Sequence, residues 1–160
     1  MLSLVLSAEL SGITELRPKD TPEEPYFFTF KVQCTSCREI HPNWISFNRF
    51  EKHEISGSRG EANFVWKCRL CQRTHSASIS TGPHVYYYDD GLKAQRIIEI
   101  DCRGLEFVEF KADGDWEAKG IESSTRFSNI DLSEGEWFDY DEKTGEEVSI
   151  KEVNWAIKRA

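Results

Sequence analysis

The stretch Leu2–Leu10, LSLVLSAEL, decides the fold class, because its apolar side chains recur at every second position. Alternation with a period of two is typical of a β-strand that buries one face and exposes the other. A second stretch, Tyr26–Val32 (YFFTFKV), repeats the pattern just before Cys34. β-branched and aromatic residues fill both stretches, as a pleated, half-buried surface favours. We therefore predict a mainly β protein.

Several further segments of the chain fit the same description. No window of a dozen residues shows the i, i+3, i+4, i+7 stripe of an amphipathic helix, so we expect at most a short helical turn in a loop. Lys143-Thr144-Gly145 has the composition of a tight turn and predicts a hairpin between Trp137–Tyr140 and Val148–Ile150. The other predicted strands are Trp44–Phe47, Phe64–Trp66, Ala77–Ile79, Ile97–Cys102, Phe107–Phe110 and Val148–Ile157.

The two halves of the chain differ in charge but share a pattern. Residues 81–160 carry 19 acidic and 10 basic side chains (net −9), and residues 1–80 carry 9 and 10 (net +1), which sum to −8. Phe28–Cys34 can be aligned with Arg96–Cys102, which indicates an internal repeat. We predict two similar small β units, sandwich-like or barrel-like: residues 1–85, which contain the paired cysteines, and the acidic residues 86–160. We expect them to pack as one compact unit.

Composition excludes several classes of protein. Hydrophobic residues make up 39% and aromatic residues 12% of the 160, which supplies a core and excludes disorder throughout. No apolar run approaches the roughly 20 residues that span a bilayer, and the apolar start lacks the basic residues of a signal peptide. An acidic second half repels phosphate, so we expect no nucleic acid and no membrane as partner. We expect a soluble protein of the cytoplasm, with the nucleus as the other location.

Two C-x-x-C pairs carry the chemistry: Cys34-Thr35-Ser36-Cys37 and Cys68-Arg69-Leu70-Cys71, with 30 residues between them. Each pair follows a predicted strand, and a C-x-x-C turn holds two sulfurs on one side of a tight knuckle. Two such knuckles offer four thiolates in the tetrahedral arrangement that Zn²⁺ favours, as in a zinc ribbon. We predict one structural Zn²⁺ per chain, bound by Cys34, Cys37, Cys68 and Cys71.

Basic residues next to the cysteines favour the thiolate form, because nearby cations lower the pKa of a thiol. They also leave nucleic-acid binding open as a weaker hypothesis, together with the neighbouring Trp66. Structural disulfides are disfavoured, because a chain without a secretory signal is expected in a reducing compartment. A thioredoxin-like redox pair is disfavoured because no βαβ pattern surrounds either motif. The flanking basic residues are Arg38, Lys67, Arg69 and Arg73.

Other polar candidates receive structural interpretations. His41 and His75 follow Cys37 and Cys71 by four residues, but four cysteines already complete a zinc shell. We interpret both histidines as neighbours of the site, and Cys102 as a small buried apolar residue. The acidic residues Asp139, Asp141 and Glu142 lack the spacing of a calcium loop, and we interpret them as a solvated turn.

Over nearly its whole length the chain resembles the eukaryotic CXXC-motif-containing zinc-binding proteins, an uncharacterised family. The resemblance implies a mostly β fold of two similar halves and one zinc held by the four cysteines named above. It implies no established reaction, and a role in metal handling or protein interaction. The matching stretches are Leu16–Pro18, Cys34–Cys37, Gly57–Gly60, Lys67–Cys71, Glu99–Glu106, Phe127–Leu132, Trp137 and Asp139–Lys143.

These observations favour a binding protein over an enzyme. A zinc ion with four cysteine ligands has no open position for water or substrate, and no G-x-S-x-G, Walker A or H-E-x-x-H motif occurs. We expect a non-catalytic zinc-binding protein that acts through contacts with another protein or in metal homeostasis, with a metal-handling protein as the expected partner. The alternative is a metal-transfer or thiol-redox protein that uses its C-x-x-C pairs.

Overall fold

The computed structural model describes residues 1–159 and folds them into strands without any helix, which confirms the mainly β prediction. The short helical turn expected in a loop is not found in this range, and no helix there could cross a membrane. The strands are β1 (Leu2–Ser11), β2 (Ile13–Pro18), β3 (Phe28–Cys34), β4 (Ile45–Phe47), β5 (His53–Glu54), β6 (Glu61–Ala62), β7 (Phe64–Lys67), β8 (Thr74–Thr81), β9 (Gln95–Arg103), β10 (Leu105–Lys111), β11 (Asp115–Gly120), β12 (Arg126–Asp131), β13 (Trp137–Asp141) and β14 (Glu146–Arg159).

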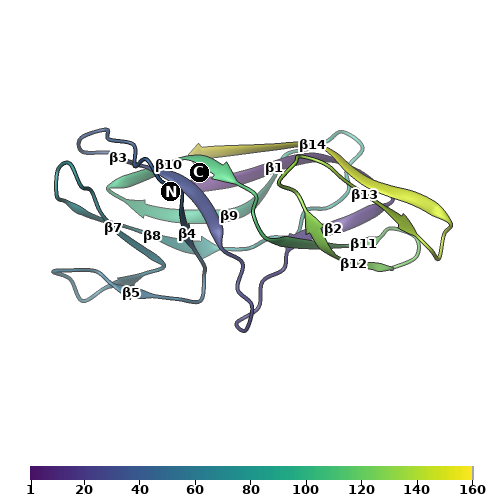
Figure 1. Cartoon of the computed structure of the whole chain (residues 1–160), viewed down its shortest axis with the longest axis horizontal. Helices are drawn as coiled ribbons and strands as arrows, with labels where there is room; N and C mark the ends of the chain where they lie inside the picture. Colours follow the sequence, from purple (N-terminus) through teal and green to yellow (C-terminus); the bar gives the residue numbers. More distant parts are fainter. Residues whose placement is uncertain (160) are drawn as a thin grey trace.

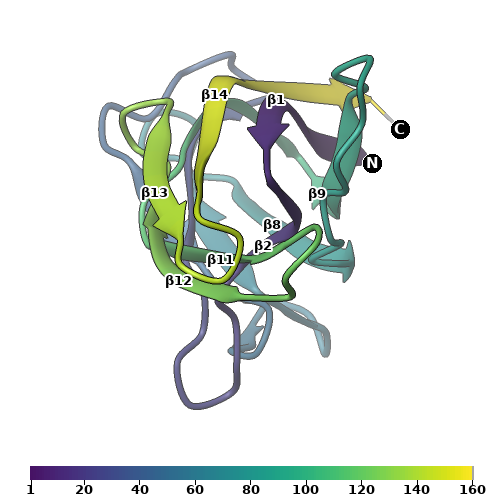
Figure 2. The ribbon, with the colours of Figure 1, turned by 90° about the vertical axis from the view of Figure 1, so that its right-hand side faces the viewer.

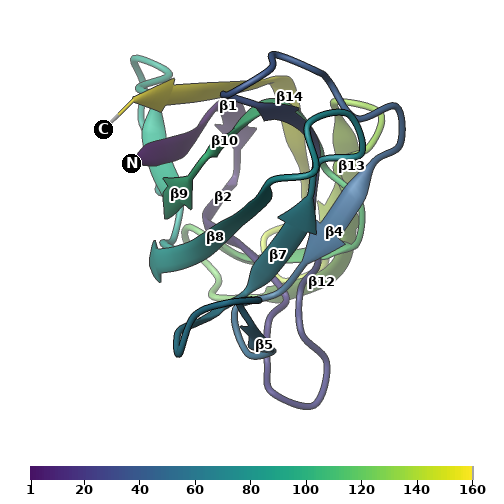
Figure 3. The same ribbon diagram turned by 90° about the vertical axis from the view of Figure 1, so that its left-hand side faces the viewer.

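A six-stranded antiparallel sheet forms the body of the molecule (Figure 1), in the order β13-β14-β1-β9-β8-β7. Two three-stranded sheets, β10-β3-β4 and β12-β11-β2, accompany it, and β5 and β6 form a small hairpin. Seen from either end, the sheets curl around a shared interior (Figures 2 and 3). The strand order is symmetric. In the six-stranded sheet, counting inward from the two edges, β14 occupies the same place as β8, and β1 the same place as β9; β3 and β11 are the central strands of the two three-stranded sheets. The prediction of two similar β units is therefore confirmed.

The two halves exchange strands. β2, from the start of the chain, pairs with β11, whereas β10, from the later half, pairs with β3. The predicted register of the repeat is wrong, because Phe28–Cys34 lies in a three-stranded sheet and the segment 96–102 lies in β9 of the large sheet. Strands with the same apolar alternation align with one another in sequence whatever sheet they join, which explains the error.

The strand Leu2–Ser11 is buried more fully than its alternation predicts. Ser3 and Val5 lie on the face expected to be exposed, yet only 2% and 8% of their surface is accessible to solvent. β1 is a central strand, paired with β14 on one side and β9 on the other, and its first half is covered on both faces. Strands that are buried on both faces have nearly continuous apolar sequences, and Leu4-Val5-Leu6 is such a run.

An aromatic cluster packs β3, β4, β7 and β10 together. The ring of Phe30 stacks on that of Phe107 with centroids 4.4 Å apart, and Phe47 stacks on Phe64 at 5.5 Å. Burying large rings gives the strongest apolar stabilisation, and offset stacking adds about 0.5–1.5 kcal/mol per pair. The cluster fixes the end of β3 close to the end of β7, and both C-x-x-C pairs begin at those ends.

Candidate metal centre

Each C-x-x-C pair forms a tight turn at the end of a strand, as predicted. Cys34 is the last residue of β3, and Cys68 directly follows β7. The backbone N–H of Arg38 donates to the Cys34 carbonyl at 2.9 Å, and that of Gln72 donates to the Cys68 carbonyl at 2.8 Å. Arg38 and Gln72 close their turns in the left-handed region, with φ of 66° and 64°. These turns direct both sulfurs of a pair to the same side.

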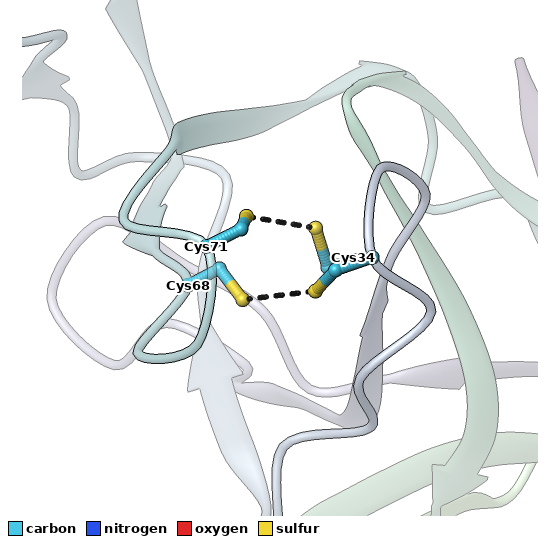
Figure 4. A group of neighbouring side chains, drawn as sticks. Cys34, Cys68 and Cys71 are labelled. Carbon is cyan, nitrogen blue, oxygen red and sulfur yellow. Dashed lines mark hydrogen bonds between the residues drawn. The ribbon is translucent and has the colours of Figure 1, made fainter.

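The structure brings all four cysteines of the two pairs together. Their sulfur atoms lie within 4.8 Å of one another. Sγ of Cys34 is 3.6 Å from Sγ of Cys71, and Sγ of Cys37 is 3.6 Å from Sγ of Cys68 (Figure 4). A tetrahedron of sulfurs with Zn–S bonds of about 2.3 Å has edges of about 3.8 Å. The cluster therefore fits a Zn²⁺ ion, and none of the cysteines is in a disulfide.

The cluster has a buried side and an open side. Cys34 and Cys68 are completely buried, whereas Cys37 and Cys71, the second cysteines of the pairs, are half-buried. The first cysteine of each pair thus continues the hydrophobic core, and the second borders the solvent.

Local hydrogen bonds favour the thiolate at the first cysteine of each pair. Burial raises the pKa of the Cys34 thiol, but hydrogen bonds from the backbone N–H groups of Cys37 and Ser36 and from the side chains of His75 and Cys71 together outweigh burial and lower that pKa to about 6. For Cys68 the backbone N–H of Cys71 has the largest effect, and it too lowers the pKa. Since the thiolate is the form that binds metal, the folded knuckles prepare these two ligands in advance.

His75 adds a further contact to the buried side. Its Nε2 lies 3.2 Å from Sγ of Cys34, and the residue is buried against Trp66, with ring centroids 5.8 Å apart. Gly104 leaves room for this ring: a Cβ there would lie 2.8 Å from Cε1 of His75 and closer still to Nδ1. The interpretation of His75 as a neighbour of the site is confirmed, whereas its hydrogen bond to a cysteine was missed. Its spacing of four residues from Cys71 was the only signal.

A family model described as CXXC motif containing zinc binding protein, eukaryotic, matches residues 3–158. The chain belongs to this family. It is 47% identical over 158 residues to a UPF0587 protein of Schizosaccharomyces pombe (99% of this chain, 98% of that one) and 40% identical over 153 residues to the CXXC motif containing zinc binding protein of Rattus norvegicus (95% and 94%). The predicted resemblance is confirmed, and family and cluster together support one zinc site.

Solved structures agree with the fold. The chain superposes on the crystal structure of C1orf123 with a TM-score of 0.90 at 38% identity, covering 99% of both chains. A hypothetical protein from Plasmodium falciparum matches with a TM-score of 0.84 over 98% of both chains, and at 21% identity that likeness shows the fold alone.

In this family member, two of the basic residues near the cysteines connect the knuckles to each other. Nη2 of Arg69 lies 3.6 Å from Oε1 of Glu39, and Nη1 of Arg73 donates to Oγ of Ser36 at 3.4 Å. Each contact joins the second knuckle to the first. Arg38 and Lys67 are exposed. Of the four basic residues, Arg69 and Arg73 therefore connect the two knuckles of the site.

The remaining candidates lie outside the cluster. His41 packs edge-on against Trp66, with centroids 6.0 Å apart, and neither it nor Cys102 belongs to the group of possible metal ligands found within residues 1–159. The interpretation of Asp139, Asp141 and Glu142 as a solvated turn is wrong for Asp141, which is only 1% exposed. Hydrogen bonds, the strongest from Ser123, hold the pKa of the Asp141 carboxyl below its usual value.

Proposed function

We propose that the chain is a non-catalytic zinc-binding protein in which Cys34, Cys37, Cys68 and Cys71 hold one structural Zn²⁺. The observation that carries this proposal is the position of the cluster between two sheets. Cys34 ends β3 of the β10-β3-β4 sheet, whereas Cys68 follows β7, the edge strand of the six-stranded sheet. An ion held by all four sulfurs joins the two sheets and has no ligand position left for a reaction.

We further propose that this protein acts by binding another protein, a metal-handling protein, in the cytoplasm or nucleus, and that it does not bind nucleic acid. The net charge of −8 supports the last point. The contacts of Arg69 with Glu39 and of Arg73 with Ser36 support it as well, because they engage cations that a phosphate backbone would need.

The experiment that tests the structural role follows metal and fold together. Elemental analysis of the purified protein should give one zinc per chain. A chelator is then added while zinc release and circular dichroism are recorded in parallel. We expect both signals to change together, because structural zinc in small peptides contributes about 10–16 kcal/mol, comparable to the roughly 5–15 kcal/mol that stabilises a whole domain.

A second function, metal transfer or thiol exchange, is favoured by one observation. Cys37 and Cys71 are half-buried, so an incoming ligand has access to one sulfur of each pair. In this case zinc would leave rapidly to a mild chelator while the circular dichroism stayed unchanged. That result would replace the structural role with transfer as the function of the site.

A further inference from the structure

The second half of the molecule contains another pair of turns built like the cysteine knuckles. The backbone N–H of Ser124 donates to the Gly120 carbonyl at 3.2 Å, and that of Gly145 donates to the Asp141 carbonyl at 2.8 Å. Ser124 and Gly145 have φ of 58° and 74°, close to the values at the ends of the two C-x-x-C turns. Gly120 ends β11 and Asp141 ends β13, the strands that match β3 and β7 in the sheet order.

The contacts between the turns and the opposite half also match. In the first half, Thr35 N–H donates to the Gly104 carbonyl at 3.0 Å, at the corner between β9 and β10. In the second half, Ile121 N–H donates to the Gly12 carbonyl at 3.1 Å, at the corner between β1 and β2. The matching bonds place Gly120, Ser123, Asp141 and Thr144 at the positions that correspond to Cys34, Cys37, Cys68 and Cys71.

A hydrogen-bonded carboxylate occupies this second position in place of a sulfur cluster. The Asp141 carboxylate accepts hydrogen bonds from Oγ1 of Thr125 at 2.9 Å, from the backbone N–H of Lys143 at 3.0 Å and from the hydroxyl of Ser123. Ser123 belongs to the first turn, Thr125 directly follows that turn, and Asp141 begins the second turn, so the bonds connect the two turns. A carboxylate buried with several donors is held strongly in place.

Gly120, the residue at the position that corresponds to Cys34, supports the match between the two pairs of turns. A Cβ built on Gly120 would lie 2.9 Å from Oδ2 of Asp141 and would also meet Oγ of Ser123. A side chain at position 120 therefore points into the centre of this network, as the side chain of Cys34 points into the sulfur cluster. Glycine leaves the space that the carboxylate fills.

We propose that the Asp141 network is the metal-free counterpart of the cysteine cluster. Asp141 fastens the second pair of turns as zinc fastens the first, and positions 120, 123, 141 and 144 form a latent tetrahedral site that binds Zn²⁺ once all four carry thiols. The inference rests on the proposed ligand set of the first half, and the test below counts the two sites separately.

The decisive experiment installs the missing thiols. The variant Gly120→Cys/Ser123→Cys/Asp141→Cys/Thr144→Cys is produced with zinc and compared by elemental analysis with the unmodified protein, each also in a Cys68→Ser background. We expect two zinc ions per chain in the quadruple variant and one in the unmodified protein. In the Cys68→Ser background we expect one zinc ion in the quadruple variant and none without the four new thiols. Cobalt(II) in place of zinc should double the thiolate charge-transfer absorption. The proposal of a latent site is overturned if the quadruple variant folds but binds only one zinc ion, or if it stays unfolded in excess zinc.

A second experiment tests the fastening role in the natural sequence. Asp141→Ala is compared with Asp139→Ala, a matched change of an exposed aspartate in the same strand. We expect about tenfold or greater loss of amide-exchange protection at the Gly120 and Gly145 amides in Asp141→Ala only. Both variants should keep one zinc per chain. Equal protection in the two variants overturns the role of Asp141, and loss of zinc from the unmodified protein would count against the proposed function instead.

Discussion

Cys68 combines complete burial with a position between the two sheets, and its sulfur lies 3.6 Å from that of Cys37. Replacing it with serine removes a thiolate whose proposed ion contributes about 10–16 kcal/mol in small zinc peptides. We expect Cys68→Ser to lose its zinc and to leave the first half poorly folded, as measured by elemental analysis and thermal unfolding. Cys102→Ser is the control, because Cys102 lies outside the cluster. An unchanged zinc content and melting temperature in Cys68→Ser would contradict the ligand assignment.

Replacing His75 measures how much a residue next to the cysteine cluster contributes to zinc affinity. Its Nε2 is 3.2 Å from Sγ of Cys34, and outer partners of metal ligands typically change metal affinity by about 10–100-fold. We therefore expect His75→Ala to weaken zinc binding by roughly that factor in a competition titration with a chelator. His84→Ala, at a histidine outside the cluster, should leave the affinity unchanged. Equal affinities for the two variants would show that the His75 contact has no effect on the metal.

At the scale of elements, the corner between β9 and β10 links the later half to the metal centre. Gly104 has φ of 83° and faces His75, whereas Gly135 has φ of 80° with nothing within 4 Å of a built Cβ. Alanine in a left-handed conformation costs about 1–2 kcal/mol. Gly135→Ala should show only that cost in denaturant unfolding. Gly104→Ala should lose clearly more stability and also bind zinc more weakly, because His75 must move. Similar losses in both variants would rule out the steric role.

The β13–β14 hairpin should carry a pH-dependent part of the stability. Hydrogen bonds lower the pKa of Asp141 in the folded protein below the unfolded value of about 3.9. The unfolded chain therefore binds the proton first as the pH falls, so this contribution is present above about pH 4 and is lost below it. The stability difference between the natural protein and Asp141→Asn should shrink below about pH 4. A difference that stayed constant from pH 7 to pH 3 would contradict this origin.

At the scale of the whole molecule, β1 and β9 join the two halves in one sheet, and β2 and β10 cross between them. Leu4 is fully buried in β1 and pairs with Ile98 of β9. Leu4→Ala should cost about 2–5 kcal/mol and should lower amide protection in both halves together. Val108→Ala, at a residue that is 39% exposed, is the control. Loss of protection confined to the first half would show that the halves unfold independently.

Local pattern was enough to predict most of the sheet and missed the strands with little apolar content. Alternation identified β1 and β3, since large apolar residues there mark the buried face, and the tight turn Lys143-Thr144-Gly145 identified the β13–β14 hairpin. The strands β2 (ITELRP), β11 (DWEAKG) and β12 (RFSNID) were not predicted. Their apolar residues are few and lie between charged and polar ones, so no alternation marks them as strands.

The sequence alone was enough to predict the four thiol ligands of the metal centre, because a C-x-x-C turn is a local structure and its sulfurs need only four consecutive residues. It also determined the β class and the acidic character of the later half. The folded structure was needed to show which strands exchange between the halves, that His75 contacts Cys34, and that Asp141 is buried in a network with Ser123. Those features depend on contacts between residues 18 to more than 90 positions apart, such as Ile121 with Gly12, and the energy of such contacts arises only once the chain has folded.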